Sequence, residues 1–190
     1  MRTITSTIIY ELIVKNSRFI SILVPINDNS NIASILDKIK DEYPKATHYC
    51  YGYITENYKK SSDDGEPGGT AGMPILNVLE KEGLINVLAV VVRYFGGIKL
   101  GAGGLVRAYT KSVKTAIDNG DLVSLTTGYQ VEISFNYDLQ KEVDYLLKDI
   151  DIISKEYGEK IIYNLLIPKD NINILNRYEY KIIKELLIKQ

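Results

Sequence analysis

Glycine is distributed unevenly along this chain of 190 residues, and that distribution constrains the fold more than any other feature. Ten of the fourteen glycines lie between Gly65 and Gly104, and a single one follows Gly128. Glycine adopts backbone conformations that other residues avoid, and it lets a backbone approach a ligand closely. We therefore expect two domains of different character, residues 1–124 and 125–190, a division that also suits the length of the chain.

The glycine-rich half is expected to form an α+β domain. The expected elements are a hairpin around 15–17, a helix within 29–44, a strand at 46–55, a helix within 73–84, a strand at 85–95 and a helix within 96–120. Runs of β-branched residues indicate the hairpin, and apolar residues at helical spacing indicate the helices. The continuous apolar run "INVLAVVVRYF" is typical of a strand that is buried on both faces.

The last third of the chain contains few glycines and several short apolar segments. The expected elements are a strand at 129–136, a helix at 138–149, strands at 150–156 and 159–167 around a turn at 157–158, a short helix at 169–177 and a strand at 180–188. This βαββαβ order is that of a ferredoxin-like domain. The segment 122–128 is the expected boundary.

The stretch "SSDDGEPGGTAG", residues 61–72, has a composition that suits neither a regular helix nor a regular strand. Its carboxylates, Asp63, Asp64 and Glu66, stand beside hydroxyl groups, and oxygen ligands of this kind coordinate Mg²⁺. One hypothesis is therefore a metal-dependent hydrolase or phosphotransferase with His48 as its base. The alternative is a solvated turn in which the aspartates accept hydrogen bonds from nearby backbone N–H groups.

A second glycine cluster, "RYFGGIKLGAGGLVRAY", leads from the buried strand into the start of a helix. Such a junction presents free N–H groups and the positive end of the helix dipole, which favour anions such as phosphate. It contains no Walker A motif, and Val106 stands where a GxGxxG motif that begins at Gly101 needs its last glycine. A nucleotide-fuelled enzyme is therefore unsupported. The alternative is a loop that packs tightly against the sheet.

The charge of the chain is locally uneven. The net charge is −1, which excludes a basic protein that coats nucleic acid without specificity. Between Arg93 and Ile117, however, there is no acidic residue. The basic residues of this segment are Arg93, Lys99, Arg107, Lys111 and Lys114. The sequence therefore predicts a local basic surface.

His48 and Cys50 are the one pair that suggests nucleophilic catalysis. Positions i and i+2 of a strand face the same side, so the imidazole can approach the thiol. The alternative is a buried thiol that packs as a small apolar group, beside a hydrogen-bonded histidine.

Two further sequence features bear on where the protein acts. A single cysteine excludes an internal disulfide bond and any zinc site with several cysteines. No apolar run reaches the roughly 18 residues of a membrane span, and the first residues lack the pattern of a signal peptide. We therefore expect a cytoplasmic protein without a membrane partner.

Four segments in this order are similar to the signature of the YigZ/Impact family. They are "KNSRFI", "ATHYCY", "SSDDGEPGGTAGMPIL" and "AVVVRYFGGIKLGAGGLVRAY", and the match spans residues 17–109. The C-terminal stretch resembles the small ferredoxin-like domain that bacterial members of the family append. Gly68 stands where other members carry alanine, a mild change in a loop.

The resemblance implies a fold and a kind of function. It implies a first domain with the ribosomal-protein-like fold of domain IV of elongation factor G, a sandwich of sheet and helices. The second domain then resembles domain V of that factor. RNA or ribosome binding and regulation of translation are the functions that this likeness implies. The family carries no accepted enzymatic activity, so binding is favoured over catalysis. A protein partner in translation control is a third possibility, and no DNA partner is expected.

Two sets of residues are predicted to form the site. The predicted nucleic-acid or anion contacts are Arg93, Tyr94, Gly96, Gly97, Lys99, Gly101, Gly103, Gly104, Arg107 and Lys111. The motif loop that would hold another ligand consists of His48, Ser62, Asp63, Asp64, Gly65, Glu66, Gly69, Thr70 and Gly72. Mg²⁺ is the one cofactor that this second set suggests, and no metal ligand is assigned.

Overall fold

The computed structural model describes residues 1–189, and the chain divides into two compact units. The first unit is Met1–Val123, and the second begins at Ser124. Both are built from an antiparallel sheet with helices, so the α+β class expected from the sequence is confirmed. Within residues 1–189, no helix has the length and apolar character that crossing a membrane requires.

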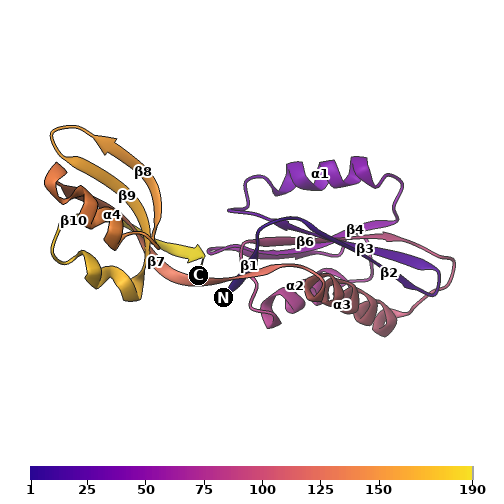
Figure 1. The fold of residues 1–190 in the computed structure, drawn as a ribbon. Coiled ribbons are helices and arrows are strands. Elements are labelled where there is room, and N and C mark those ends of the chain that lie inside the picture. Colours follow the sequence, from indigo (N-terminus) through magenta and orange to yellow (C-terminus); the bar gives the residue numbers. More distant parts are fainter. Residues whose placement is uncertain (190) are drawn as a thin grey trace. The chain divides into compact units, whose positions relative to one another are not determined.

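The first unit is organised around one five-stranded sheet (Figure 1). Its strands, in spatial order, are β2 (Ile8–Val14), β3 (Ser17–Pro25), β6 (Val87–Tyr94), β4 (His48–Ile54) and β5 (Lys59–Ser62). A short strand β1 (Arg2–Ile4) precedes them. All neighbours in this order are antiparallel, and His48 of β4 lies opposite Arg93 of β6. The register therefore places two predicted site residues side by side at one end of the sheet.

Helices cover both faces of this sheet, which explains why β6 is apolar from Val87 to Val92. Helix α1 (Ile32–Glu42) lies on one face, and α2 (Gly72–Lys81) and α3 (Ala102–Asp118) lie on the other (Figure 1). Val90 and Val92 belong to the core beneath α1, whereas Ala89 and Val91 belong to the core beneath α2 and α3. The predicted strand with two buried faces is confirmed.

The second unit is a ferredoxin-like βαββαβ domain. Its elements are β7 (Leu122–Phe135), η1 (Tyr137–Leu139), α4 (Gln140–Leu146), β8 (Asp151–Tyr157), β9 (Ile161–Pro168), η2 (Lys169–Leu175) and β10 (Glu179–Lys189). The strands lie in the order β10, β7, β9, β8, and every pair is antiparallel. Its core contains Val131, Ile133, Tyr163 and Leu165 among others.

Three local details differ from the sequence-based expectation. The expected boundary segment 122–128 is strand, because β10 supplies partners as far as Leu125. Ser61 and Ser62, expected in the acidic loop, belong to β5 and pair with β4. The short helix expected at 169–177 is a 3₁₀ helix over Lys169–Leu175, and its asparagines favour turns over α-helix.

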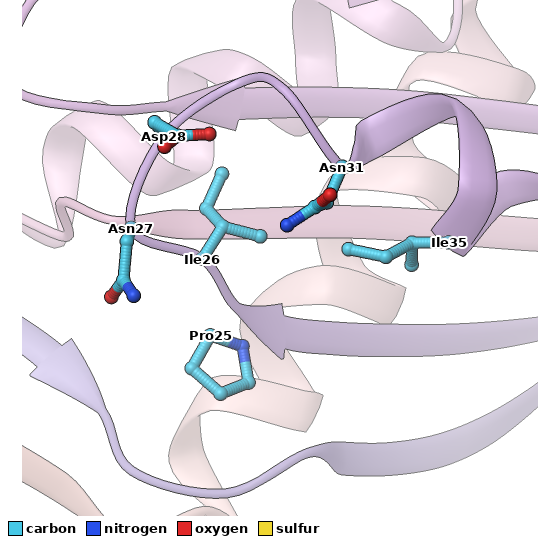
Figure 2. Close-up of a pocket in the computed structure, with 6 residues that line it drawn as sticks. All are labelled: Pro25, Ile26, Asn27, Asp28, Asn31 and Ile35. Carbon is cyan, nitrogen blue, oxygen red and sulfur yellow. The ribbon is translucent and has the colours of Figure 1, made fainter.

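A cavity of about 320 Å³ lies where β3 leads into α1 (Figure 2). Its lining residues are Pro25, Ile26, Asn27, Asp28, Asn31 and Ile35. The Asp28 carboxylate accepts a hydrogen bond from the Ser30 backbone N–H at 2.7 Å, so it closes a surface turn. Among the described residues, no basic side chain lines this cavity, and none of the predicted site residues belongs to its lining.

Candidate functional site

Asp63 holds the acidic loop closed around its own backbone. Its carboxylate accepts hydrogen bonds from the N–H groups of Gly69 (2.8 Å), Ala71 (3.0 Å) and Gly72 (2.8 Å). Burial opposes its ionisation, but these three donors prevail and lower the pKa of Asp63 below its ordinary value. Since the last two donors belong to the start of α2, Asp63 is an internal anion at that helix N-terminus.

Asp64 attaches the same loop to strand β4. Its carboxylate accepts a hydrogen bond from the Tyr49 N–H at 2.6 Å, and its carbonyl oxygen lies 2.8 Å from Nδ1 of His48. A carbonyl oxygen can only accept, so Nδ1 of His48 carries the proton. The other ring nitrogen, Nε2, lies 3.9 Å from a carboxylate oxygen of Glu66. The loop thereby orients the imidazole.

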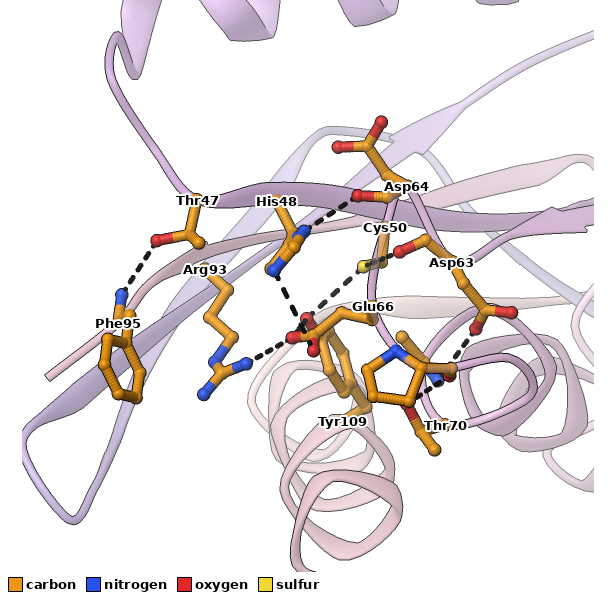
Figure 3. A network of polar contacts seen from close by, with 12 residues as sticks. Thr47, His48, Cys50, Asp63, Asp64, Glu66, Thr70, Arg93, Phe95 and Tyr109 are labelled. Carbon is orange, nitrogen blue, oxygen red and sulfur yellow. Dashed lines mark hydrogen bonds and ion pairs between the residues drawn. The ribbon is translucent and has the colours of Figure 1, made fainter. Parts of the chain in front are cut away.

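Glu66 forms the buried centre of the polar network in Figure 3. Its Oε1 accepts hydrogen bonds from Nη1 of Arg93 and, at 2.8 Å, from the hydroxyl of Tyr109. Arg93 and Glu66 are only 5% and 7% exposed, so their charges must compensate each other. Burial also raises the pKa of Tyr109, which therefore stays a donor. The ion pair connects the acidic loop to β6, and the Tyr109 hydrogen bond connects it to α3.

The three carboxylates of the motif loop therefore point to different partners. Within residues 1–189, no three His, Cys, Asp or Glu side chains are arranged to hold a metal ion. The hydrogen bonds of Asp63 and Asp64 are those of a closed turn. The residues present thus do not fit the Mg²⁺ site that the sequence suggested.

Cys50 does not have the surroundings of a nucleophile. It is fully buried, and its sulfur lies 2.9 Å from the carbonyl oxygen of Asp63 and 3.3 Å from the hydroxyl of Tyr109. Burial raises the pKa of the thiol to about 12. Because a thiolate is the reactive form, this cysteine is held as a neutral donor. The nucleophilic interpretation of the pair is wrong.

An open cavity of about 360 Å³ lies beside this network, and we call it the Arg93 cavity. Its lining residues are Thr47, His48, Glu66, Pro67, Arg93, Phe95, Lys99, Leu100, Gly101, Ala102 and Leu105. The acidic loop, the end of β6 and the start of α3 therefore meet in one place. Thr47 accepts a hydrogen bond from the Phe95 N–H at 3.0 Å and so fixes the backbone at the rim (Figure 3).

A second cavity, of about 230 Å³, adjoins the first at Leu100. Its lining residues are Val14, Lys15, Leu100, Gly104, Arg107, Ala108 and Lys111. Lys15 comes from the β2–β3 turn, far from the others in sequence, and it was not assigned to the site although it begins the segment "KNSRFI". Thr47 and Pro67 were likewise missed, because only the fold brings them to α3.

The predicted basic residues separate into two groups. Lys99, Arg107 and Lys111 are exposed, and none of them has a carboxylate partner within residues 1–189. We call these three residues, together with Lys15, the basic face. Arg93 is buried in its ion pair, and Lys114 is paired with Glu82 at 3.1 Å and Asp118 at 2.5 Å. Tyr94 donates its hydroxyl hydrogen to the carbonyl oxygen of Pro44 at 3.2 Å.

The positions of the second cluster require glycine for different structural reasons. A Cβ at Gly96 would lie 2.0 Å from the backbone of Asn16, so Gly96 allows two backbones to touch. Gly101 precedes α3 with a φ of 71°, a conformation that favours glycine. None of the described side chains caps this end of α3, and the first N–H groups of a helix have no partner within it. The start of α3 is thus a free donor surface beside the basic face.

These features define a two-domain α+β protein whose glycine-rich loops close around a buried Arg–Glu pair. Comparison with known proteins agrees with that class. The model of the Impact N-terminal domain matches residues 15–117. The chain belongs to the IMPACT family, as its motifs indicated.

Individual relatives extend the likeness beyond the first unit. The chain is 35% identical over 174 residues to IMPACT family member YvyE of Bacillus subtilis, covering 89% of this chain and 80% of that one. It is 36% identical over 168 residues to IMPACT family member YigZ of Escherichia coli, covering 82% and 79%. A crystal structure of a hypothetical protein shares the fold with a TM-score of 0.67, at 28% identity over 95% of both chains.

Proposed function

We propose that this protein binds RNA through the basic face at the start of α3 and acts in the regulation of translation. The observation that carries the proposal is that exposed cations and the N-terminus of α3 meet at one place. Among residues 1–189, these cations have no carboxylate partner and this N-terminus has no side-chain cap. Either feature attracts phosphate, and together they cover several phosphates of a strand. The implied likeness of both domains to elongation factor G supports a partner in the translation apparatus, and hence a cytoplasmic location.

The charge distribution sets the expected strength of binding. Since the whole chain carries a net charge of −1, attraction depends on the basic face and not on the protein as a whole. Each phosphate neutralised on a single strand contributes about −0.7 to the slope of log affinity against log salt concentration. A contact made mainly by Lys99, Arg107 and Lys111 gives a slope of about −2. Binding is therefore modest and sensitive to salt.

Fluorescence anisotropy with a labelled single-stranded RNA tests the RNA contact. The double variant Lys99→Ala/Arg107→Ala is expected to bind more weakly, with a slope reduced by about 1.4. Lys38→Ala/Lys40→Ala is the matched control, because it removes the same charge from α1 on the opposite face of the sheet. Equal slopes for the two double variants would contradict the proposal.

Sedimentation in sucrose gradients tests the link to translation. Purified protein is layered with ribosomes or isolated subunits at low and at moderate salt. Comigration that the Lys99→Ala/Arg107→Ala variant loses, and that the α1 control keeps, is the expected result. Absence of comigration at both salt concentrations would remove the ribosome from the proposal and leave only free RNA or a protein partner to test.

A further inference from the structure

The floor of the Arg93 cavity combines a hydrogen-bond donor with an acceptor. Arg93 uses Nη1 for Glu66, and its Nε is buried without a partner in the described part of the chain. Oε2 of Glu66 accepts no hydrogen bond from any residue within 1–189, and Nε2 of His48 is 3.9 Å away. Because Nε has almost no accessible surface, the donor available to a ligand is Nη2, which makes no hydrogen bond within residues 1–189. Buried polar groups are normally hydrogen-bonded, so this guanidinium favours a ligand at the floor of the cavity.

The charge of this floor argues against a phosphate as the bound group. The positive charge of Arg93 is already balanced by Glu66, so a dianion there gains little attraction and meets a carboxylate. The phosphate contacts of the proposed function lie beside this floor, where Lys99 and the start of α3 line the same cavity, and they continue along the basic face. A neutral ligand with an adjacent donor and acceptor matches the floor better.

The walls of the cavity favour a flat, partly apolar ligand. Pro67, Leu100 and Leu105 contribute apolar surface, and Phe95 stands at the rim with 47% of its surface exposed. Its ring centroid lies 5.6 Å from Cζ of Arg93, so the ring is held near the guanidinium. An exposed aromatic ring beside a basic surface is a platform on which a base stacks.

We propose that the Arg93 cavity binds one unpaired nucleobase of the RNA strand. The base lies against Phe95, and its polar edge hydrogen-bonds to Arg93 and Glu66. Its phosphate then lies near Lys99 and the first N–H groups of α3. A volume of about 360 Å³ suits a nucleoside-sized ligand. The inference rests on the proposed function for the phosphate contacts, and it adds a preference for single-stranded RNA, because bases in a duplex are not free to enter.

The first test uses the wild-type protein with small ligands. Isothermal titration calorimetry is performed with the four nucleoside 5′-monophosphates, the matching nucleosides and inorganic phosphate. Binding of nucleosides and monophosphates, with no binding of inorganic phosphate, is expected. Binding of inorganic phosphate alone, or of none of these ligands, would overturn the assignment of a base to the cavity.

The second test removes the stacking platform. Phe95→Ala is expected to weaken binding of the monophosphates and of single-stranded RNA by roughly tenfold. Tyr58→Ala is the matched control, because Tyr58 is an exposed aromatic residue, 61% exposed, that does not line the cavity. Circular dichroism checks that both variants are folded. Equal affinity of the two variants would contradict the proposal.

The third test separates this inference from the proposed function. An abasic ribose-phosphate oligomer has the same phosphates as the RNA of equal length but no bases. If the inference holds, the wild type binds the abasic oligomer about tenfold more weakly, and Phe95→Ala changes that binding no further. If both oligomers bind alike while Lys99→Ala/Arg107→Ala still weakens them, the cavity assignment fails and the basic face stands. If Lys99→Ala/Arg107→Ala has no effect on either oligomer, the proposed function itself fails.

Discussion

Helices α2 and α3 both begin after a glycine-rich loop, yet their N-termini differ in whether a side chain accepts hydrogen bonds from the first N–H groups. The start of α2 has an anion of its own, the carboxylate of Asp63, which accepts hydrogen bonds from Ala71 and Gly72. The start of α3 has no side-chain cap in the part of the chain that the structure describes, and it faces the Arg93 cavity and the basic face. The two loops have similar compositions but different roles. The loop before α2 stabilises the fold, whereas the loop before α3 leaves N–H donors free for a ligand.

The buried ion pair joins the first loop to β6, the strand that leads into the second loop, and breaking it should have the largest effect. Glu66→Gln keeps the shape of the side chain but leaves the charge of Arg93 buried without compensation. We expect a loss of about 3–5 kcal/mol in the free energy of unfolding, measured by urea denaturation. Glu80→Gln, which breaks an exposed pair with Lys59, should cost less than about 1 kcal/mol. Similar losses of stability in the two variants would mean that the buried pair matters no more to the fold than an exposed pair does.

Removing the internal anion of α2 should have the next largest effect. Asp63→Ala leaves three backbone donors without their acceptor, and we expect a loss of about 2 kcal/mol in the free energy of unfolding. Asp28→Ala removes a carboxylate that accepts one backbone hydrogen bond in a surface turn, so it should cost less than about 1 kcal/mol. If Asp63→Ala is as mild as this control, the two helix starts are more alike than their hydrogen bonds indicate.

Low pH should reduce the contribution of Asp63 to the free energy of unfolding. Its pKa is lowered in the folded protein, so its contribution is fully present above the unfolded pKa of about 3.9 and is lost as the pH falls through the folded value. The stability difference between the wild type and Asp63→Ala should therefore be constant above about pH 5 and should shrink below about pH 4. Urea denaturation at pH 6 and pH 3 measures it. A difference that persists unchanged at pH 3 would assign the effect to packing.

Giving α3 an anion of its own should have the smallest effect on stability and the most specific effect on binding. Ala102→Asp places a carboxylate in the first turn of α3, beside the Arg93 cavity. We expect a gain of about 0.5 kcal/mol in the free energy of unfolding, because an anion suits this end of a helix.

The same carboxylate should repel the phosphates of RNA, so affinity should fall severalfold. Ala102→Asn is the control, since it has the same shape without the charge. Anisotropy with single-stranded RNA and urea denaturation measure the two effects. Unchanged RNA affinity in Ala102→Asp would mean that the start of α3 is not in contact with phosphate.

Local sequence patterns predicted the elements because each pattern has a local physical cause. The apolar run before Arg93 predicted a strand with two buried faces, and β6 is that strand. The ordered motifs indicated the family, and the comparisons confirm it. Residues 125–128 of β7 were missed, because their partner β10 lies about sixty residues later in the chain. A window of sequence contains no information about such a partner.

The sequence alone determined the α+β class, the family and the residue types available to the site. Tertiary structure decided what those residues do. The segment from Arg93 to Ile117 contains only basic charges, but packing buries Arg93 against Glu66, pairs Lys114 with Glu82 and brings Lys15 beside Arg107. The physical reason is that burial and pairing depend on distances between residues remote in sequence, whereas strand and helix patterns depend on near neighbours.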